Sequence, residues 1–194
     1  MPILRADRVY LRPAERSDLP TFVRWLADAE TKRFLALRAP FSLAMEEKWF
    51  DTLVEQQGRD RYHFVICLID DGRPIGSADL REVNLENGSA AFGIAIGENE
   101  LWGRGYGTEA LQVLCDFGFG QLRLERIELD VYADNARAQR SYEKAGFQVE
   151  GVLRHGHFAD GAFMDVIRMS LLRSEWQAQE RPRSWEMHAA RKRS

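Results

Sequence analysis

The sequence is short of the features that mark secreted, membrane-spanning and disulfide-stabilised proteins. Its 194 residues include only two cysteines, Cys67 and Cys115, and both lie in apolar stretches. We expect both to be buried, reduced and non-catalytic, because neither has a histidine or a cation beside it to lower the thiol pKa. The longest apolar run covers residues 64–69, far below the ~20 residues of a membrane-spanning helix. The N-terminus also lacks the apolar segment of a signal peptide, so we expect a cytoplasmic protein.

Neither the charge balance nor the histidines single out a function. Lysine and arginine total 27 against 30 acidic residues, and the net charge of −3 gives no basic footprint for nucleic acid. His155 and His157 alternate near the end of the chain, but no third ligand is evident, so we expect no metal site. A hydrophobic content of 45% and a charged fraction of 29% are ordinary for a globular protein. We predict one domain over residues 1–175 and a polar, basic tail over residues 176–194.

The most informative stretch is Leu-Trp-Gly-Arg-Gly-Tyr-Gly-Thr-Glu-Ala, residues 101–110. Three glycines at alternate positions lead into an amphipathic segment, for which Thr108 is the predicted N-cap. A glycine-rich turn that opens a helix directs free N–H groups at one spot, where the helix dipole favours an anion. The stretch therefore predicts diphosphate binding, with an ordinary helix-capping turn as the alternative. It is not a P-loop, because no Gly-Lys-Ser/Thr follows, and it fits a dinucleotide-binding fingerprint poorly.

A second stretch, residues 134–147, has the pattern of a short helix with defined ends. Asn135 is a good N-cap, and Gly146 stands where a helix C-terminus favours a left-handed residue. Tyr142 follows Asn135 by seven residues, so the two lie on one helix face, roughly two turns apart. The preceding residues 126–132 alternate between polar and apolar, which predicts a strand.

Together these stretches resemble the GNAT superfamily of acetyl-CoA-dependent N-acetyltransferases. Trp102, Gly105 and Gly107 occupy the places of the signature Gln/Arg-x-x-Gly-x-Gly/Ala; Trp102 departs from it, but Arg104 can supply the charge. The family motif Asn-x-x-Ser/Ala-x-x-x-Tyr-x-x-x-Gly-Phe is matched at every spacing by Asn135, Ala138, Tyr142, Gly146 and Phe147. Residues 150–154 and 160–165 look like the branch that holds the ribosomal-protein N-terminal (alanine/serine) acetyltransferases.

Strand and helix patterns follow the order β-α-α-β-β-β-α-β-α-β-β along the chain. Helices are predicted to begin after Ser17 and Ser42, and the strand patterns cover residues 3–12, 63–69, 75–85, 89–96, 126–132, 147–154 and 163–172. This order predicts a mixed α/β sandwich. The resemblance implies the GNAT form of it, a central twisted, mostly antiparallel sheet flanked by helices.

The resemblance also implies acetyl-CoA as cosubstrate and assigns the residues that hold it. The glycine loop, residues 103–108, would bind the diphosphate through its amides, and Ala95 and Ile96 would hydrogen-bond the pantetheine arm in strand fashion. A backbone amide there would polarise the thioester carbonyl. The expected cofactor-binding residues are Ala95, Ile96, Trp102, Gly103, Arg104, Gly105, Tyr106, Gly107, Thr108 and Asn135.

Three residues are candidates for catalysis. Tyr142 is the expected general acid for the leaving thiolate, because a phenol with a pKa near 10 is protonated at pH 7; the alternative is a tyrosine that packs in the core. Asp130, on a strand expected to be central, is a candidate base, and Glu82 is its rival. The alternative for Asp130 is a surface ion pair with Arg126 or Arg137.

The sequence therefore predicts an N-acetyltransferase that moves an acetyl group directly to a primary amine in a ternary complex. The acceptor we expect first is a protein N-terminus. The alternatives are a small amine (a polyamine, an amino sugar or an aminoglycoside) or a non-catalytic acyl-CoA sensor, although an intact Tyr142 favours an enzyme. The expected partners are acetyl-CoA and the amine, with a homodimer left open and neither membrane nor nucleic acid involved.

Overall fold

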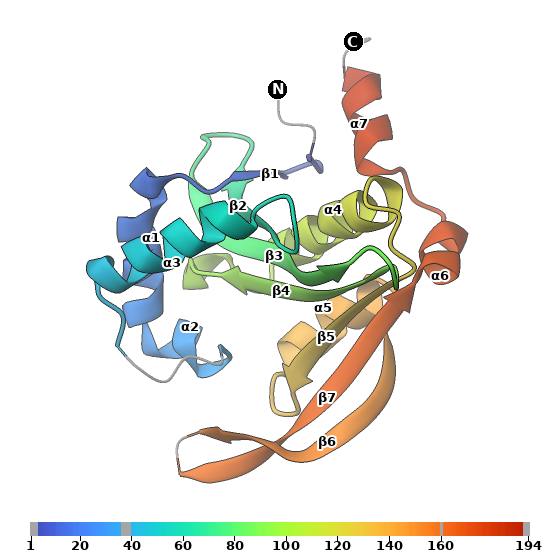
Figure 1. Ribbon diagram of the computed structural model, residues 1–194. Coiled ribbons are helices and arrows are strands. Elements are labelled where there is room, and N and C mark those ends of the chain that lie inside the picture. The colour runs from blue at the N-terminus through green and yellow to red at the C-terminus, as the bar shows by residue number, and fades with distance from the viewer. Residues whose placement is uncertain (1–3, 36–39, 160, 192–194) are drawn as a thin grey trace.

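The computed structural model describes residues 4–35, 40–159 and 161–191, and it shows one sheet with helices on both faces (Figure 1). The sheet has seven strands in the order β1-β2-β3-β4-β5-β7-β6. The strands are β1 (Val9–Pro13), β2 (Tyr62–Leu68), β3 (Pro74–Asn84), β4 (Ser89–Ile96), β5 (Arg126–Tyr132), β6 (Gln148–Ala159) and β7 (Ala162–Leu172). The helices are α1 (Leu19–Ala27), α2 (Ala29–Arg33), α3 (Leu43–Gln56), α4 (Tyr106–Gly120), α5 (Ala136–Lys144), α6 (Arg173–Ala178) and α7 (Ser184–Arg191).

The predicted fold class and element order are confirmed, with three additions. A five-residue helix, α2, stands between the two expected N-terminal helices, and α6 and α7 follow the last strand. The final hairpin is also longer than predicted, because β6 continues to Ala159 instead of ending near residue 154. Among the described pairings, only β4 and β5 run parallel, so the sheet is mostly antiparallel.

The two faces of the sheet are covered by different helices. On β2, Val65 and Cys67 pack with α1 and α3, whereas Phe64 and Ile66 face the larger core formed with α4 and α5. Because this strand is buried on both faces, it reads as a continuous apolar run in the sequence. Helices α1 and α3 thus cover the β1–β3 side of one face (Figure 1).

The parallel pair β4–β5 opens at one end. Ser89, Ala90 and Ala91 pair with Arg126, Ile127 and Glu128, and the pairing between the two strands stops there. Beyond this point β4 continues to pair with β3 and β5 with β7, so the two strands run apart (Figure 1). We call residues 92–96 of β4 and 129–132 of β5 the fork. The β5-facing backbone groups of β4 have no described strand partner in the fork.

The segment after residue 175 packs against α4. Trp176 is buried, its ring stacks on Phe119, and its indole N–H donates to Asp116 at 2.9 Å. The same carboxylate accepts hydrogen bonds from Arg181 and from the backbone N–H of Ser184. The buried aspartate therefore ties this basic segment to the helix that carries the glycine loop at its other end.

Candidate active site

The glycine loop takes backbone conformations that favour glycine. Gly103 and Gly105 have φ angles of 74° and 89°, in the left-handed region that residues with a Cβ rarely adopt. Gly105 is the N-cap of α4, so the helix begins before the position expected from the sequence. The prediction that Thr108 caps this helix is wrong. Thr108 lies in the first turn, and its hydroxyl instead hydrogen-bonds that of Ser141 on α5, at 2.6 Å.

A glycine N-cap leaves the start of α4 open to an anion. Gly105 has no side chain to accept a hydrogen bond from the first turn, and the N–H of Glu109 is the one that bonds the Gly105 carbonyl, at 3.1 Å. The N–H groups of Tyr106, Gly107 and Thr108 precede the first intrahelical bond and therefore point outward. With the dipole of a 15-residue helix behind them, they form a site suited to phosphate oxygens.

Arg8, the residue before β1, contacts the loop from the side and was missed by sequence reasoning. Its guanidinium pairs with Glu109 at 2.5 Å, donates to the Arg104 carbonyl at 3.0 Å and lies 4.6 Å from the centre of the Tyr106 ring. By neutralising Glu109, Arg8 removes a negative charge that would oppose an anion at the helix N-terminus. No local sequence signal could have paired residues that are 101 positions apart.

Trp102 connects the loop to the fork. Its indole N–H donates to the Ile96 carbonyl at 2.8 Å, and the Arg137 guanidinium lies 3.7 Å from its ring centre. Ala95 and Ile96 pair with β3 on one side and lie in the fork on the other. Arg104 is exposed. The predicted cofactor-binding residues of the loop and of β4 are thus brought together at one end of the sheet.

Tyr142 lies on α5, whose N-cap is Asn135 as predicted. The Asn135 side-chain oxygen accepts from the Ala138 N–H at 3.1 Å. Tyr142 is 8% exposed and packs near Phe92 on β4 and near Phe147. No hydrogen-bond partner for its hydroxyl lies among the residues that the structure describes. Burial raises the pKa of Tyr142 to about 12, although the charge of Arg81 opposes the shift. The phenol is therefore protonated at neutral pH, as a general acid must be.

The two candidate bases lie apart from Tyr142. Both Asp130 oxygens accept from Arg168, each at 2.9 Å, and the two side chains are almost half exposed. Arg168 is the cross-strand neighbour of Asp130 on β7, so the ion-pair partner is neither of the two arginines considered from the sequence. Glu82 is exposed, with a φ of 54°, at an irregularity in β3. Neither carboxylate contacts Tyr142 among the described residues.

A buried charged cluster on the α1–α3 face of the sheet was also missed. Asp79 on β3 is 5% exposed and pairs with Arg61 at 2.6 Å and Arg81 at 3.1 Å, and its carboxylate lies 4.0 Å from the His63 ring nitrogen. Burial raises the pKa of Asp79, but the neighbouring His63, Arg81 and Arg61 outweigh it, and the net pKa is lowered. Alternating charges in a strand that reads as central were the available signal.

The cluster reaches β4 at Gly93, two residues beyond the last β4–β5 pair. A Cβ atom at Gly93 would come within 2.3 Å of Arg81 Nη1 and 2.6 Å of Asp79 Oδ1. A larger residue at this position would therefore force the Arg81 and Asp79 side chains to move. The Asp79 and Arg81 side chains lie across β4 at the start of the fork.

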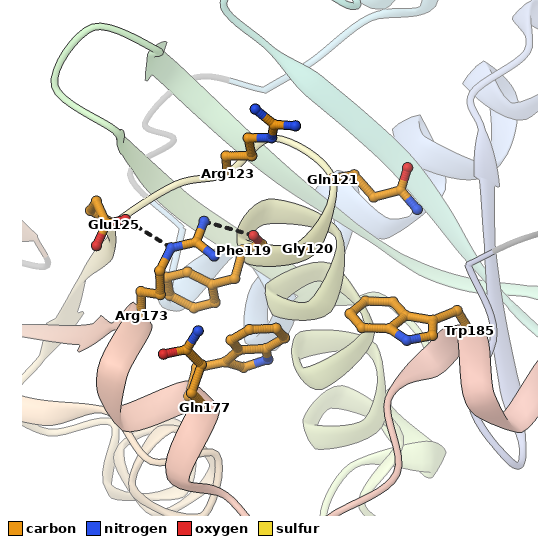
Figure 2. A pocket seen from close by; sticks show the side chains of 9 residues that line it. Phe119, Gly120, Gln121, Arg123, Glu125, Arg173, Gln177 and Trp185 are labelled. Atoms are coloured by element: carbon orange, nitrogen blue, oxygen red, sulfur yellow. Dashed lines mark hydrogen bonds and ion pairs between the residues drawn. The ribbon is translucent and has the colours of Figure 1, made fainter.

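A cavity of about 640 Å³ lies at the opposite end of α4 from the glycine loop. Its walls include Phe119, Trp176 and Trp185, and Figure 2 shows Arg173 between Glu125 and the end of the helix. Arg173 donates to the Phe119 carbonyl at 2.7 Å and pairs with Glu125 at 2.9 Å, so it caps the C-terminus of α4. The cavity shares no lining residue with the glycine loop or with Tyr142.

Both cysteines are free and buried, as predicted. Burial raises the pKa of each thiol, which disfavours the thiolate that a nucleophilic role needs. Within the described ranges, no group of three or more His, Cys, Asp or Glu side chains is placed to hold a metal ion. None of the described helices is long and apolar enough to cross a membrane.

Comparison with known proteins agrees with this arrangement. The family described as acetyltransferase (GNAT) domain matches residues 8–148. Spermidine N(1)-acetyltransferase of Escherichia coli is 32% identical over 177 residues, which cover 91% of this chain and 92% of that protein. An N-acetyltransferase of Bacillus licheniformis is 30% identical over 178 residues, or 91% of this chain and 99% of that one.

Comparison with solved structures also finds an N-acetyltransferase. The crystal structure of spermidine N-acetyltransferase from Vibrio cholerae in complex with CoA and spermine superposes with a TM-score of 0.81 at 28% identity, covering 87% of this chain and 98% of that one. The ribosomal branch receives weaker support. A Bacillus subtilis protein provisionally named a ribosomal N-acetyltransferase is 30% identical over 113 residues, or 58% of this chain and 61% of its own.

Proposed function

Since the chain belongs to the GNAT acetyltransferase family and is an acetyl-CoA-dependent N-acetyltransferase, we propose that its acceptor is a small-molecule amine. The support comes from relatives that match nearly the whole chain and are named for acetylating spermidine, a small amine. From the sequence we expected a protein N-terminus first. The relatives support the small-amine alternative better, since the ribosomal relative matches just over half of the chain.

In our proposal, acetyl-CoA binds along one continuous strip of backbone. The first-turn N–H groups of α4 hold the diphosphate, and Ala95 and Ile96 in the fork pair with the pantetheine arm. Arg104 adds a cation beside the phosphates, and Asn135, which caps α5, contacts the arm. Because backbone groups make most of these contacts, the glycines matter more for acetyl-CoA binding than the side chains of the loop do.

The reaction we propose is direct transfer. The neutral amine attacks the thioester carbonyl carbon, and a backbone amide of the fork stabilises the oxyanion. The carbon–sulfur bond then breaks, Tyr142 gives its phenolic proton to the sulfur, and the amine loses one proton, so atoms and charge balance. Asp130 or Glu82 would accept that proton. Asp130 needs a rearrangement of its ion pair with Arg168 to do so.

The observation that carries an enzymatic role is the state of Tyr142. Its hydroxyl is protonated at neutral pH, has no described hydrogen-bond partner and stands beside β4 of the fork. An acyl-CoA sensor has no need of such an acid. The test is to mix the protein with acetyl-CoA, a panel of amines and a thiol reagent. We expect amine-dependent release of CoA, whereas binding of acetyl-CoA without release would support the sensor.

A homodimer stays a prediction. The strand β6 stands at the edge of the sheet and exposes Val149 and Val152. Exposed apolar side chains on an edge strand favour pairing with a second copy. Light scattering of the purified protein would decide between monomer and dimer.

A further inference from the structure

We propose that Arg81 and Arg61 bind an anionic group of the acceptor, so that the enzyme prefers amines that carry a carboxylate near the reacting nitrogen over purely cationic amines. This inference rests on the proposed function and narrows its substrate class. The acceptor it describes has the chemistry of an amino acid.

The Arg81 side chain projects from β3 and lies across β4 at Gly93, where β4 and β5 have just separated. Its charge also acts on Tyr142, since it lowers the phenol pKa against the effect of burial. The two side chains lie on opposite faces of the sheet. Tyr142 packs with Phe92 on the α4–α5 face, and Arg81 lies with Asp79 on the α1–α3 face, so they stand on either side of β4 at the fork.

The cluster has more positive than negative charges. Asp79 is one carboxylate shared by two permanent cations, Arg61 and Arg81. The three side chains carry a net charge of +1, even without His63. The acid in register with Arg81 across the sheet, Glu128, lies two strands away and is already bound by Arg126 at 2.9 Å. A carboxylate from a ligand would balance the cluster.

Most N–H donors of the Arg81 guanidinium have no described partner. A guanidinium has five N–H donors, and the described contacts of Arg81 use one bond, from Nη1 to Asp79. The Arg81 side chain is 43% exposed, compared with 7% for Asp79. The accessible charge of the cluster is thus positive, because its negative charge is buried beneath the arginines. A planar guanidinium also matches a carboxylate in bidentate geometry.

These features work against a polyamine at this point. A polyamine would place further ammonium groups beside Arg81 and Arg61, and the carboxylate that could bind them is already paired on both oxygens. Like charges at such close range repel strongly when they are partly shielded from water. The same electrostatics favour an α-amino acid, whose carboxylate stands beside its amine.

The experiment compares matched acceptors that differ by one carboxylate: alanine with ethylamine, phenylalanine with phenethylamine, and lysine with cadaverine, with spermidine as a further cation. For each, kcat/KM is measured by release of CoA. We expect the amino acid to exceed its decarboxylated partner at least tenfold in the wild type. Arg81→Gln should remove most of that preference by raising the KM of the amino acid, and Arg81→Lys should restore part of it.

Arg16→Gln is the control, because Arg16 forms an exposed pair with Asp51 far from the fork along the chain and should leave the ratio unchanged. Arg61→Gln tests the second cation if Arg81 variants fold poorly. A wild type that prefers the decarboxylated amines or spermidine would overturn the inference and leave the proposed function standing. A protein that releases no CoA with any amine would overturn both.

Discussion

Replacing Tyr142 with phenylalanine tests the chemical step most directly, because the change removes one oxygen atom and keeps the ring. The ring packs near Phe92 and Phe147, and the hydroxyl has no described hydrogen-bond partner. We therefore expect the variant to fold normally, with acetyl-CoA affinity changed by less than ~0.5 kcal/mol. Isothermal titration calorimetry and thermal melting measure these two quantities.

The expected loss is in kcat. General acid catalysis contributes about 10²–10⁴-fold, and the pKa of Tyr142 decides where in this range the effect falls. A phenol with a pKa of about 12 is a weaker acid than a free thiol, whose pKa is about 8.5. It releases its proton only as charge develops on the sulfur, so we expect the lower end, roughly a 10²-fold loss or ~2.7 kcal/mol.

The raised pKa of Tyr142 also determines how kcat and stability should depend on pH. The neutral phenol should persist to a pH of about 12, so Tyr142 should cause no alkaline loss of kcat at pH 8–10, unlike a tyrosine of ordinary pKa. In the unfolded chain the phenol ionises near pH 10. The folded protein therefore loses stability as pH rises through 10–12, by about 3 kcal/mol at most from this residue. Tyr142→Phe should remove this loss.

Two results would refute this reasoning. One is a Tyr142→Phe enzyme with wild-type kcat under conditions where chemistry limits the rate, which would make Tyr142 a packing residue. The other is an alkaline limb near pH 10 that disappears in the variant, which would mean that burial does not raise the pKa. Single-turnover measurements with pre-bound acetyl-CoA separate the chemical step from product release.

Three further predictions concern the cofactor site and the thiols. Gly107→Val should weaken acetyl-CoA binding at least tenfold, or ~1.4 kcal/mol by calorimetry, with the fold retained because a Cβ there comes no closer than 3.6 Å to a neighbour; unchanged affinity would place the cofactor elsewhere. Arg8→Gln should also weaken binding, by exposing the charge of Glu109 at the helix N-terminus, and adding Glu109→Gln should restore it; no recovery would mean that Arg8 acts on the loop shape. The double variant Cys67→Ala, Cys115→Ala should keep its turnover if it folds, and an acetylated cysteine with ping-pong kinetics would contradict direct transfer.

The parts that sequence reasoning predicted well depend on short-range patterns. The two motifs could be recognised because each lies within one loop and one helix, and the Asn135 cap depends on a residue three positions away. The wrong prediction that Thr108 caps α4 also has a local cause. A capping side chain is the usual signal for a helix start, but the left-handed Gly105 begins the helix earlier and leaves its amides free.

The parts that could not be predicted depend on strand register. Asp130 meets Arg168, and Asp79 and Arg81 meet Gly93, because hydrogen bonding between strands sets these residues opposite or next to each other. A sequence without its pairing partners does not specify that register. The Arg8–Glu109 pair joins the residue before β1 to the start of α4, and it could not be predicted for the same reason.

The half of the site that would hold acetyl-CoA consists mainly of backbone groups, so a glycine pattern and a cap suffice to identify it. The half that we propose faces the acceptor consists of side chains such as Arg81, whose effect depends on which strand lies beside it. Two chains can therefore share the cofactor motif and the fold and still select acceptors that differ in charge. For this reason our proposal for the acceptor rests on the charge of Arg81 beside Gly93 and not on the spermidine for which the relatives are named.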